Sequence, residues 1–384
     1  MKNNKLKYSK VIGLTFCFSL LVLVSCSKKD EEVLPEDPTA EDYDKAPMLT
    51  NYSNEYIKPA YSAYYTAVTE LKNEVTSFNT TLTVASLQNL RTKWENALLV
   101  WQDVAFLEFG PAANISLRAQ TNVYPVDTIL MKSNIASGTY SLAAGSNFDA
   151  KGFQAIDYLL YGLEVTDVNL VTYYSNTANA RTYLQDVVDE LEVNASTVKN
   201  EWFGSYSESF IANSASNAQG SSVSNVVNAI TQHYETYLRK GKIGLPVGAF
   251  NGFSNQPMPE HVEAYYSNQS LPYVYRSVTA FQNFIKGKGY VSAANGVGLD
   301  DYMSFVNAQN GGQNLHTIID NQFNAIRIEL DNINDPLSNE VDVNVNNSGV
   351  NTVYGKMQQM VGYIKVDMTN ALDVLITYQD SDGD

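Results

Sequence analysis

Cysteine and histidine are the scarcest reactive residues in this sequence of 384 residues, with two and three copies respectively. Cys17 lies inside an apolar N-terminal run and Cys26 follows directly after it. If that run is removed, the mature chain keeps a single cysteine. It can then form no internal disulfide and no thiolate metal site, so its stability must come from a hydrophobic core.

Basic residues are also in short supply. The chain has 25 Lys and Arg against 41 Asp and Glu, which gives a formal net charge of −16. A surface of this sign repels nucleic acid, which is itself a polyanion. We therefore exclude DNA and RNA as partners of this protein.

The N-terminus has the pattern of an export signal. Four lysines precede residues 11–24, a mostly apolar run that is shorter than the roughly 20 residues of a membrane span and typical of a signal peptide. The run ends in Leu23-Val24-Ser25-Cys26, which resembles a bacterial lipobox. We expect residues 1–25 to be a lipoprotein signal peptide and Cys26 to carry lipid, with an ordinary cleaved signal as the alternative.

The residues after Cys26 are poor in aliphatic side chains. Ser27-Lys28-Lys29-Asp30-Glu31-Glu32 resembles the surface-export signal of Bacteroidetes lipoproteins, although a plain acidic linker has the same composition. Residues 26–48 cannot bury enough apolar surface to fold, so they are expected to form a flexible acidic tether. The expected location is the outer membrane, on its periplasmic or cell-surface face, with the membrane as a partner through the lipid.

Apolar residues recur at helical spacing in most of the remaining chain, as in residues 49–79 and 87–104. We predict an all-α fold. The chain after the tether is long for a single hydrophobic core, so we expect two tandem helical bundles, residues 49–215 and 216–384. Ser86 and Asp149 are predicted helix N-caps. Residues 262–266 and 354–378 are predicted helices.

The helix predicted at residues 152–162 has two faces. One is apolar, and the other carries Gln154, Asp157, Tyr158 and Tyr161 at positions i, i+3, i+4 and i+7. Side chains one turn apart can share one ligand. This second face is therefore predicted to meet a cleft or another domain.

The chain resembles the imelysin-like family, a group also classed as peptidases and linked to iron uptake. The resemblance spans about residues 49–380 and depends on an ordered set of short motifs. These are Trp94 and Trp101, NVYPVDT at 122–128, KGFQAIDYLLYG at 151–162, GKIGLPVG at 241–248 and EAYYSNQS at 263–270. The resemblance implies two helical bundles facing each other across a shared site, with a metal ion, iron, as the implied cofactor.

The family signature is Gly-x-His-x-x-Glu, and here Gly152 is retained while Gln154 and Asp157 replace His and Glu. Gln has no ring nitrogen with which to bind a transition metal or to carry a proton near neutral pH. The leading interpretation is a ligand-binding or accessory protein in metal or nutrient uptake. The alternatives are a metallopeptidase whose missing His is supplied elsewhere, and a structural lipoprotein without a small ligand.

Two further features complete the predicted ligand site. The segment 265–270 resembles the Ser/Asn-rich segment of the family that faces the central helix; its candidates are Tyr266, Ser267, Gln269 and Ser270. An ordinary helix end with capping hydroxyls is the alternative. Arg118 lies in a loop where it could clamp an anion, or it is simply a surface residue. The ligand itself, a small molecule or an envelope protein, is not identified by the sequence.

Overall fold

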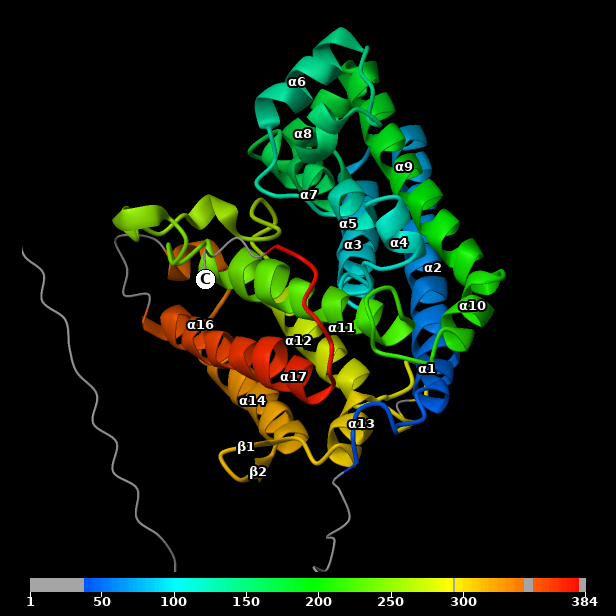
Figure 1. Cartoon of the computed structure of the whole chain (residues 1–384). Coiled ribbons are helices and arrows are strands. Elements are labelled where there is room, and N and C mark those ends of the chain that lie inside the picture. The colour runs from blue at the N-terminus through cyan, green and yellow to red at the C-terminus, as the bar shows by residue number, and fades with distance from the viewer. Residues whose placement is uncertain (1–37, 293, 342–347, 380–384) are drawn as a thin grey trace, which may run out of the picture. The chain divides into compact units, whose positions relative to one another are not determined.

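Helices form almost all of the regular structure in this computed structural model, which describes residues 38–292, 294–341 and 348–379 (Figure 1). The predicted signal peptide, Cys26 and most of the predicted tether lie outside the described residues. Strands are limited, within the described residues, to one antiparallel pair of two-residue strands, β1 (Gln309–Asn310) and β2 (Gln313–Asn314). The prediction of an all-α fold is confirmed.

The N-terminal set of helices packs around α2, which contacts both α3 and α9 along its length (Figure 1). The apolar stripe predicted in residues 49–79 is buried, including Tyr64, Leu71 and Phe78. The set comprises α1 (Ala46–Asn51), η1 (Tyr52–Ile57), α2 (Lys58–Thr80), α3 (Val84–Trp101), α4 (Pro111–Asn114), α5 (Leu117–Thr121), α6 (Thr128–Ser137), η2 (Gly145–Ala150), α7 (Gly152–Asp157), η3 (Tyr158–Gly162), α8 (Asp167–Asn176), α9 (Ala178–Phe203) and α10 (Tyr206–Ala212).

The C-terminal set packs α14 against α12 and α16, and α16 against η4. Phe281 and Phe323 meet at its centre, with ring centroids 5.7 Å apart. The set comprises α11 (Ser222–Gln232), the π-helix η4 (His233–Gly244), η5 (Gly252–Ser254), η6 (Pro259–His261), α12 (Leu271–Ile285), α13 (Leu299–Phe305), α14 (Leu315–Leu330), α15 (Leu337–Glu340), α16 (Ser348–Val361), η7 (Gly362–Met368) and α17 (Thr369–Ala371).

The two sets are held together by polar and aromatic contacts. The Arg276 guanidinium donates two hydrogen bonds, of 2.6 and 2.7 Å, to the buried carboxylate of Asp103. The rings of Tyr52 and Phe284 stack 4.2 Å apart. Both sets belong to one compact unit, and the division near residue 215 stays a prediction. Within the described part of the chain, no helix has the length and apolar character to cross a bilayer.

Several predicted helix boundaries are wrong. Thr83 is the N-cap of α3, and Ser86 completes the capping box from the third helical position. Lys151 occupies the N-cap position of α7, whereas Asp149 lies in the short 3-10 helix before it. The closing helix ends at Ala371, well before residue 378.

Candidate functional site

The first residue of α7, Gly152, occupies a position that only glycine fits. Gly152 has a φ of 75°, and a Cβ at this position would lie 2.2 Å from the carbonyl oxygen of Thr121. The apolar face of the helix is fully buried, and Trp94 Nε1 donates a 3.0 Å hydrogen bond to the Phe153 carbonyl. The orientation of α7 is thereby fixed, and with it the direction of Gln154 and Asp157.

Gln154 and Asp157 both hold the segment 264–267 through its backbone. Gln154 Oε1 accepts a 2.7 Å bond from the Ala264 N–H. The two Asp157 oxygens accept bonds of 2.8 and 3.0 Å from the N–H groups of Tyr266 and Ser267. The two side chains are 3% and 1% exposed, so the predicted pair meets another segment of the same chain across a buried contact.

This clamped segment forms a series of turns, and the prediction of a helix over residues 262–266 is wrong. Ala264 and Asn268 have φ values of 56° and 61°, in the left-handed region that interrupts a helix. Ser267 Oγ donates to the Ala264 carbonyl, and Ser270 Oγ donates to the Glu263 carbonyl. The hydroxyls thus satisfy backbone groups that a helix would have paired.

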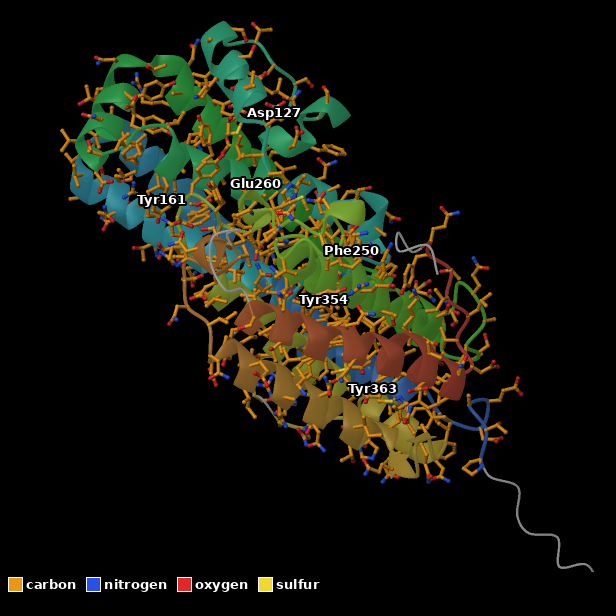
Figure 2. The ribbon with its side chains drawn as sticks, turned by 90° about the vertical axis from the view of Figure 1, so that its left-hand side faces the viewer. Asp127, Tyr161, Phe250, Glu260, Tyr354 and Tyr363 are labelled. Atoms are coloured by element: carbon orange, nitrogen blue, oxygen red, sulfur yellow. The ribbon has the colours of Figure 1, made fainter. Side chains whose placement is uncertain are left out.

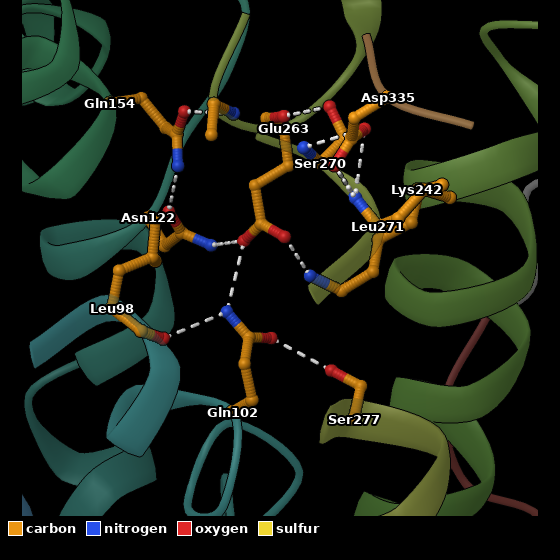
Figure 3. A network of polar contacts seen from close by, with 11 residues as sticks. Leu98, Gln102, Asn122, Gln154, Lys242, Glu263, Ser270, Leu271, Ser277 and Asp335 are labelled. Carbon is orange, nitrogen blue, oxygen red and sulfur yellow. Dashed lines mark hydrogen bonds and ion pairs between the residues drawn. The ribbon is translucent and has the colours of Figure 1, made fainter. Parts of the chain in front are cut away.

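A buried polar network centred on Glu263 continues from Gln154 (Figure 3). Gln154 Nε2 donates to Asn122 Oδ1 over 2.9 Å, and Asn122 Nδ2 donates to Glu263 Oε1 over 2.7 Å. Gln102 Nε2 donates to the same oxygen over 3.2 Å. Lys242 Nζ forms an ion pair with the other oxygen, Oε2. Glu263 therefore receives donors from both sets of helices.

Burial controls the electrostatics of these groups. Loss of solvent raises the pKa of Asp157 to about 7, although its bonds from Tyr266 and Ser267 act in the opposite direction, and the nearby Glu263 charge adds to the increase. Burial also lowers the pKa of Lys242, which the adjacent Glu263 partly offsets. Ionised Asp157 is consequently costly to keep inside the fold.

Two cavities border this network. A small cavity of about 170 Å³ is lined by Gln154 and Asp157 together with Tyr265 and Tyr266. A larger one of about 350 Å³, the central cavity, is lined by Asn122 and Tyr124 and reaches Lys242 and Arg118. Tyr124 lines both cavities, so the predicted motif residues and Arg118 face neighbouring spaces.

Arg118 is buried, and it lies on α5 in the wall of the central cavity. Its Nε and Nη2 donate to the Ala105 carbonyl at 3.3 and 3.1 Å, and its backbone N–H bonds to the Glu108 carboxylate. The guanidinium carbon lies 3.9 Å from the centre of the Tyr237 ring. The alternative of a surface arginine is therefore wrong.

The remaining predicted residues join other contacts. The rings of Tyr158 and Tyr266 meet edge to face at 4.9 Å. Tyr161 and Gln269 both donate to Glu95 Oε1, at 3.0 and 2.9 Å, rather than to Asp157. Figure 2 shows Tyr161 among the N-terminal helices.

Sequence reasoning assigned no role to several central residues. Asn122, Lys242 and Glu263 stand at the beginning of three motifs that carry the family resemblance, which was the available signal. Gln102 and His233 lie outside those motifs, and only their place in the fold brings them to the network and the central cavity. The contacts of Gln102 and His233 join residues that are far apart in the sequence, so local sequence patterns do not indicate these contacts.

An iron ion does not fit the residues at the motif. Among the described residues, no cluster of three or more His, Cys, Asp or Glu side chains is placed to hold a metal. The oxygens of Gln154 and Asp157 are committed to backbone N–H groups, and Glu263 is paired with Lys242. The lysine adds a positive charge that opposes binding of a cation.

This fold and site define an all-α protein with a buried polar network at a modified Gly-x-His-x-x-Glu helix. The family model described as Imelysin (Peptidase M75) matches residues 57–360. The chain therefore belongs to the imelysin family, and the resemblance seen in the sequence is confirmed.

Two solved structures have a similar fold. One is an iron-regulated protein A precursor from Parabacteroides distasonis ATCC 8503, with 18% identity, a TM-score of 0.70 and coverage of 88% of this chain and 97% of that one. The other is an imelysin-like protein from Psychrobacter arcticum 273-4, with 15% identity, a TM-score of 0.67 and coverage of 89% and 99%. A search of curated proteins finds no match.

Proposed function

We propose that this protein is a lipid-anchored binding protein of the cell envelope that serves metal or nutrient uptake and is not a peptidase. One observation carries the proposal: Gln154 and Asp157 bind backbone N–H groups of their own chain. These residues therefore shape and hold a site, and the carboxylate is not left open to hold a metal or to activate water.

The link to uptake comes from the family and from one neighbour. The Parabacteroides distasonis protein is described as iron-regulated, and the family match supports a related role for this chain. Export and anchoring follow from the lipobox-like sequence ending at Cys26. Palmitate labelling tests the anchor: the wild type should incorporate label and Cys26→Ser should not.

The peptidase alternative has one observation in its favour. His233 is buried at the central cavity, and neither ring nitrogen has a hydrogen-bond partner among the described residues. However, Arg118 and Lys242 line the same cavity, and their charges oppose a metal ion beside that imidazole.

Metal stoichiometry and peptide cleavage distinguish the two functions. The purified protein is stripped of metal, loaded with iron or zinc and analysed by mass spectrometry, and then incubated with a fluorogenic peptide library. We expect neither tight stoichiometric metal nor cleavage. Tight metal with cleavage that is lost in Asp157→Ala would establish the peptidase instead.

A further inference from the structure

The central cavity has an unusual charge for this protein. Its wall contains Arg118, Lys240 and Lys242, and no Asp or Glu is among its lining residues. The whole chain has 41 acidic and only 25 basic residues. Lys242 is paired with Glu263 just behind the wall, and Arg118 adds a buried positive charge to the wall. Such a space attracts anions and disfavours cations.

Arg118 has capacity for a further hydrogen-bond acceptor. An arginine carries five N–H donors, and here Nε and Nη2 are bonded to the Ala105 carbonyl. Nη1 has no hydrogen-bond or ion-pair partner within the described part of the chain. The side chain is held in place by the Tyr237 ring, at 3.9 Å. It is thus preorganised for an oxygen ligand and does not lose much entropy on binding.

His233 provides a second open polar group in the same wall. It is 3% exposed, and neither ring nitrogen makes a hydrogen bond of good geometry to the described residues. Its ring faces Tyr237, with centroids 6.0 Å apart. Burial, with the nearby Arg118 and Lys242, holds the pKa of His233 well below its ordinary value, although a weak contact with the Ala105 backbone acts in the opposite direction. The neutral imidazole has one N–H donor and one acceptor, and no well-formed hydrogen bond within the described residues occupies either of them.

The rest of the cavity wall is largely apolar. Trp101, Ala105, Val123 and Leu245 contribute to it. The volume of about 350 Å³ lies at the lower end of the range for small-molecule sites, which is roughly 300 to 1,000 Å³. The ligand must therefore combine a small apolar body with a negative group.

We propose that the central cavity binds a small organic carboxylate, whose negative group lies between Arg118 and His233 and whose body contacts the wall at Trp101 and Leu245. This inference rests on the proposed function, because it names the ligand class of a binding protein. The proposed ligand is an anion and not the bare metal cation that the family implies. This anion is either a free carboxylate or the carboxylate part of an iron complex.

Matched probes test the ligand class. Calorimetric titrations compare acetate, phenylacetate and citrate with acetamide, phenylacetamide and phenethylamine, and citrate is added with and without one equivalent of iron(III). We expect at least one carboxylate to bind and its neutral or cationic partner not to bind. Binding of citrate alone would indicate a free acid, and binding only with iron(III) would indicate the complex. Absence of binding by every carboxylate, or equal binding by the amides, would overturn the proposal.

Variants then locate the site. Arg118→Met should weaken binding of the carboxylate about 10- to 100-fold, the usual effect of losing a charged hydrogen bond. Arg118→Lys should weaken this binding less. Ala119→Phe, which fills the cavity from a partly exposed position, keeps every charge and should also abolish binding. Unchanged affinity in folded Ala119→Phe would place the ligand elsewhere. Peptide cleavage would overturn the proposed function without affecting this result, and loss of carboxylate binding would leave that function intact.

Discussion

Gln154 accepts a 2.7 Å hydrogen bond from the backbone N–H of Ala264, a residue 110 positions further along the chain. Ala264 is buried and has a φ of 56°, a conformation that costs an L-residue roughly 1–2 kcal/mol. A long-range bond to a residue of the family signature therefore stabilises a strained turn. In this chain the signature position has a structural task.

Gln154→Ala should lower the free energy of unfolding by about 1–3 kcal/mol, because Ala264 and Asn122 each lose a buried partner. Urea unfolding followed by circular dichroism measures the change. Gln88→Ala is the matched control, since the Gln88 side chain is exposed and bonds only to half-buried Asp167; it should change stability by less than about 0.5 kcal/mol. Equal losses in the two variants would contradict a special role for Gln154.

Asp157 should make the protein less stable as pH rises from 4 to 7. The folded state raises the pKa of this carboxyl from 3.8 to about 7, so the folded protein binds its proton more tightly than the unfolded chain does. The resulting stability is fully present below the unfolded pKa and is lost as pH rises through the folded one, by about 4 kcal/mol at most. Unfolding of the wild type and Asp157→Asn at several pH values measures it.

The comparison with Asp157→Asn is needed because burial also raises the pKa of Asp103, Glu108, Asp300 and Asp335. These groups titrate in both proteins, so the difference in stability isolates Asp157. That difference should shift in favour of the variant as pH rises from 4 to 7. A difference independent of pH would show that the carboxyl is not perturbed.

Lys242→Met should destabilise the protein by about 3–5 kcal/mol, because it leaves the Glu263 charge buried beside only two amide donors. The double variant Lys242→Met with Glu263→Gln should recover part of the loss. Lys93→Met is the control, because Lys93 and Glu70 form an ion pair with side chains 41% and 47% exposed; its cost should stay below about 1 kcal/mol. A double variant no more stable than Lys242→Met would argue against an uncompensated charge.

Gly152→Ala should destabilise the protein more than Gly220→Ala does. Both glycines have positive φ values, 75° and 88°, so both substitutions carry the backbone cost of roughly 1–2 kcal/mol. Only at Gly152 would the new Cβ also meet the Thr121 carbonyl oxygen, at 2.2 Å, whereas nothing lies within 4 Å at Gly220. Thermal unfolding of the two variants separates steric clash from backbone strain, and similar losses would contradict the clash.

Local patterns in the sequence predicted the long helices because apolar spacing decides them. Leu87, Leu90, Trp94 and Trp101 follow that spacing, and all are buried on α3. The prediction of a helix over residues 262–266 failed because long-range contacts, and not apolar spacing, decide the conformation there. The apolar and polar residues of this segment suit a helix, but the bonds from Gln154 and Asp157 impose turns, and those partners are more than 100 residues away.

The part of the site that depends on local sequence was predicted, and the part that depends on long-range contacts was not. Gln154, Asp157, Tyr266 and Ser267 come together, because one helix face and one short segment carry them. Arg118 was found by its chemistry but was assigned to a loop near a carboxylate, and it lies on α5 beside Tyr237. His233 gave no signal, since its isolation from hydrogen-bond partners is a property of the packed structure alone.

The contrast between an acid-free wall and a chain of net charge −16 has a kinetic consequence. At low ionic strength, the acidic exterior slows the approach of every negatively charged molecule, including one that the interior would retain. Added salt screens this repulsion beyond a Debye length of about 8–10 Å but has less effect on groups already inside. Capture of an anion should therefore speed up as salt rises, the reverse of the steering seen when opposite charges attract.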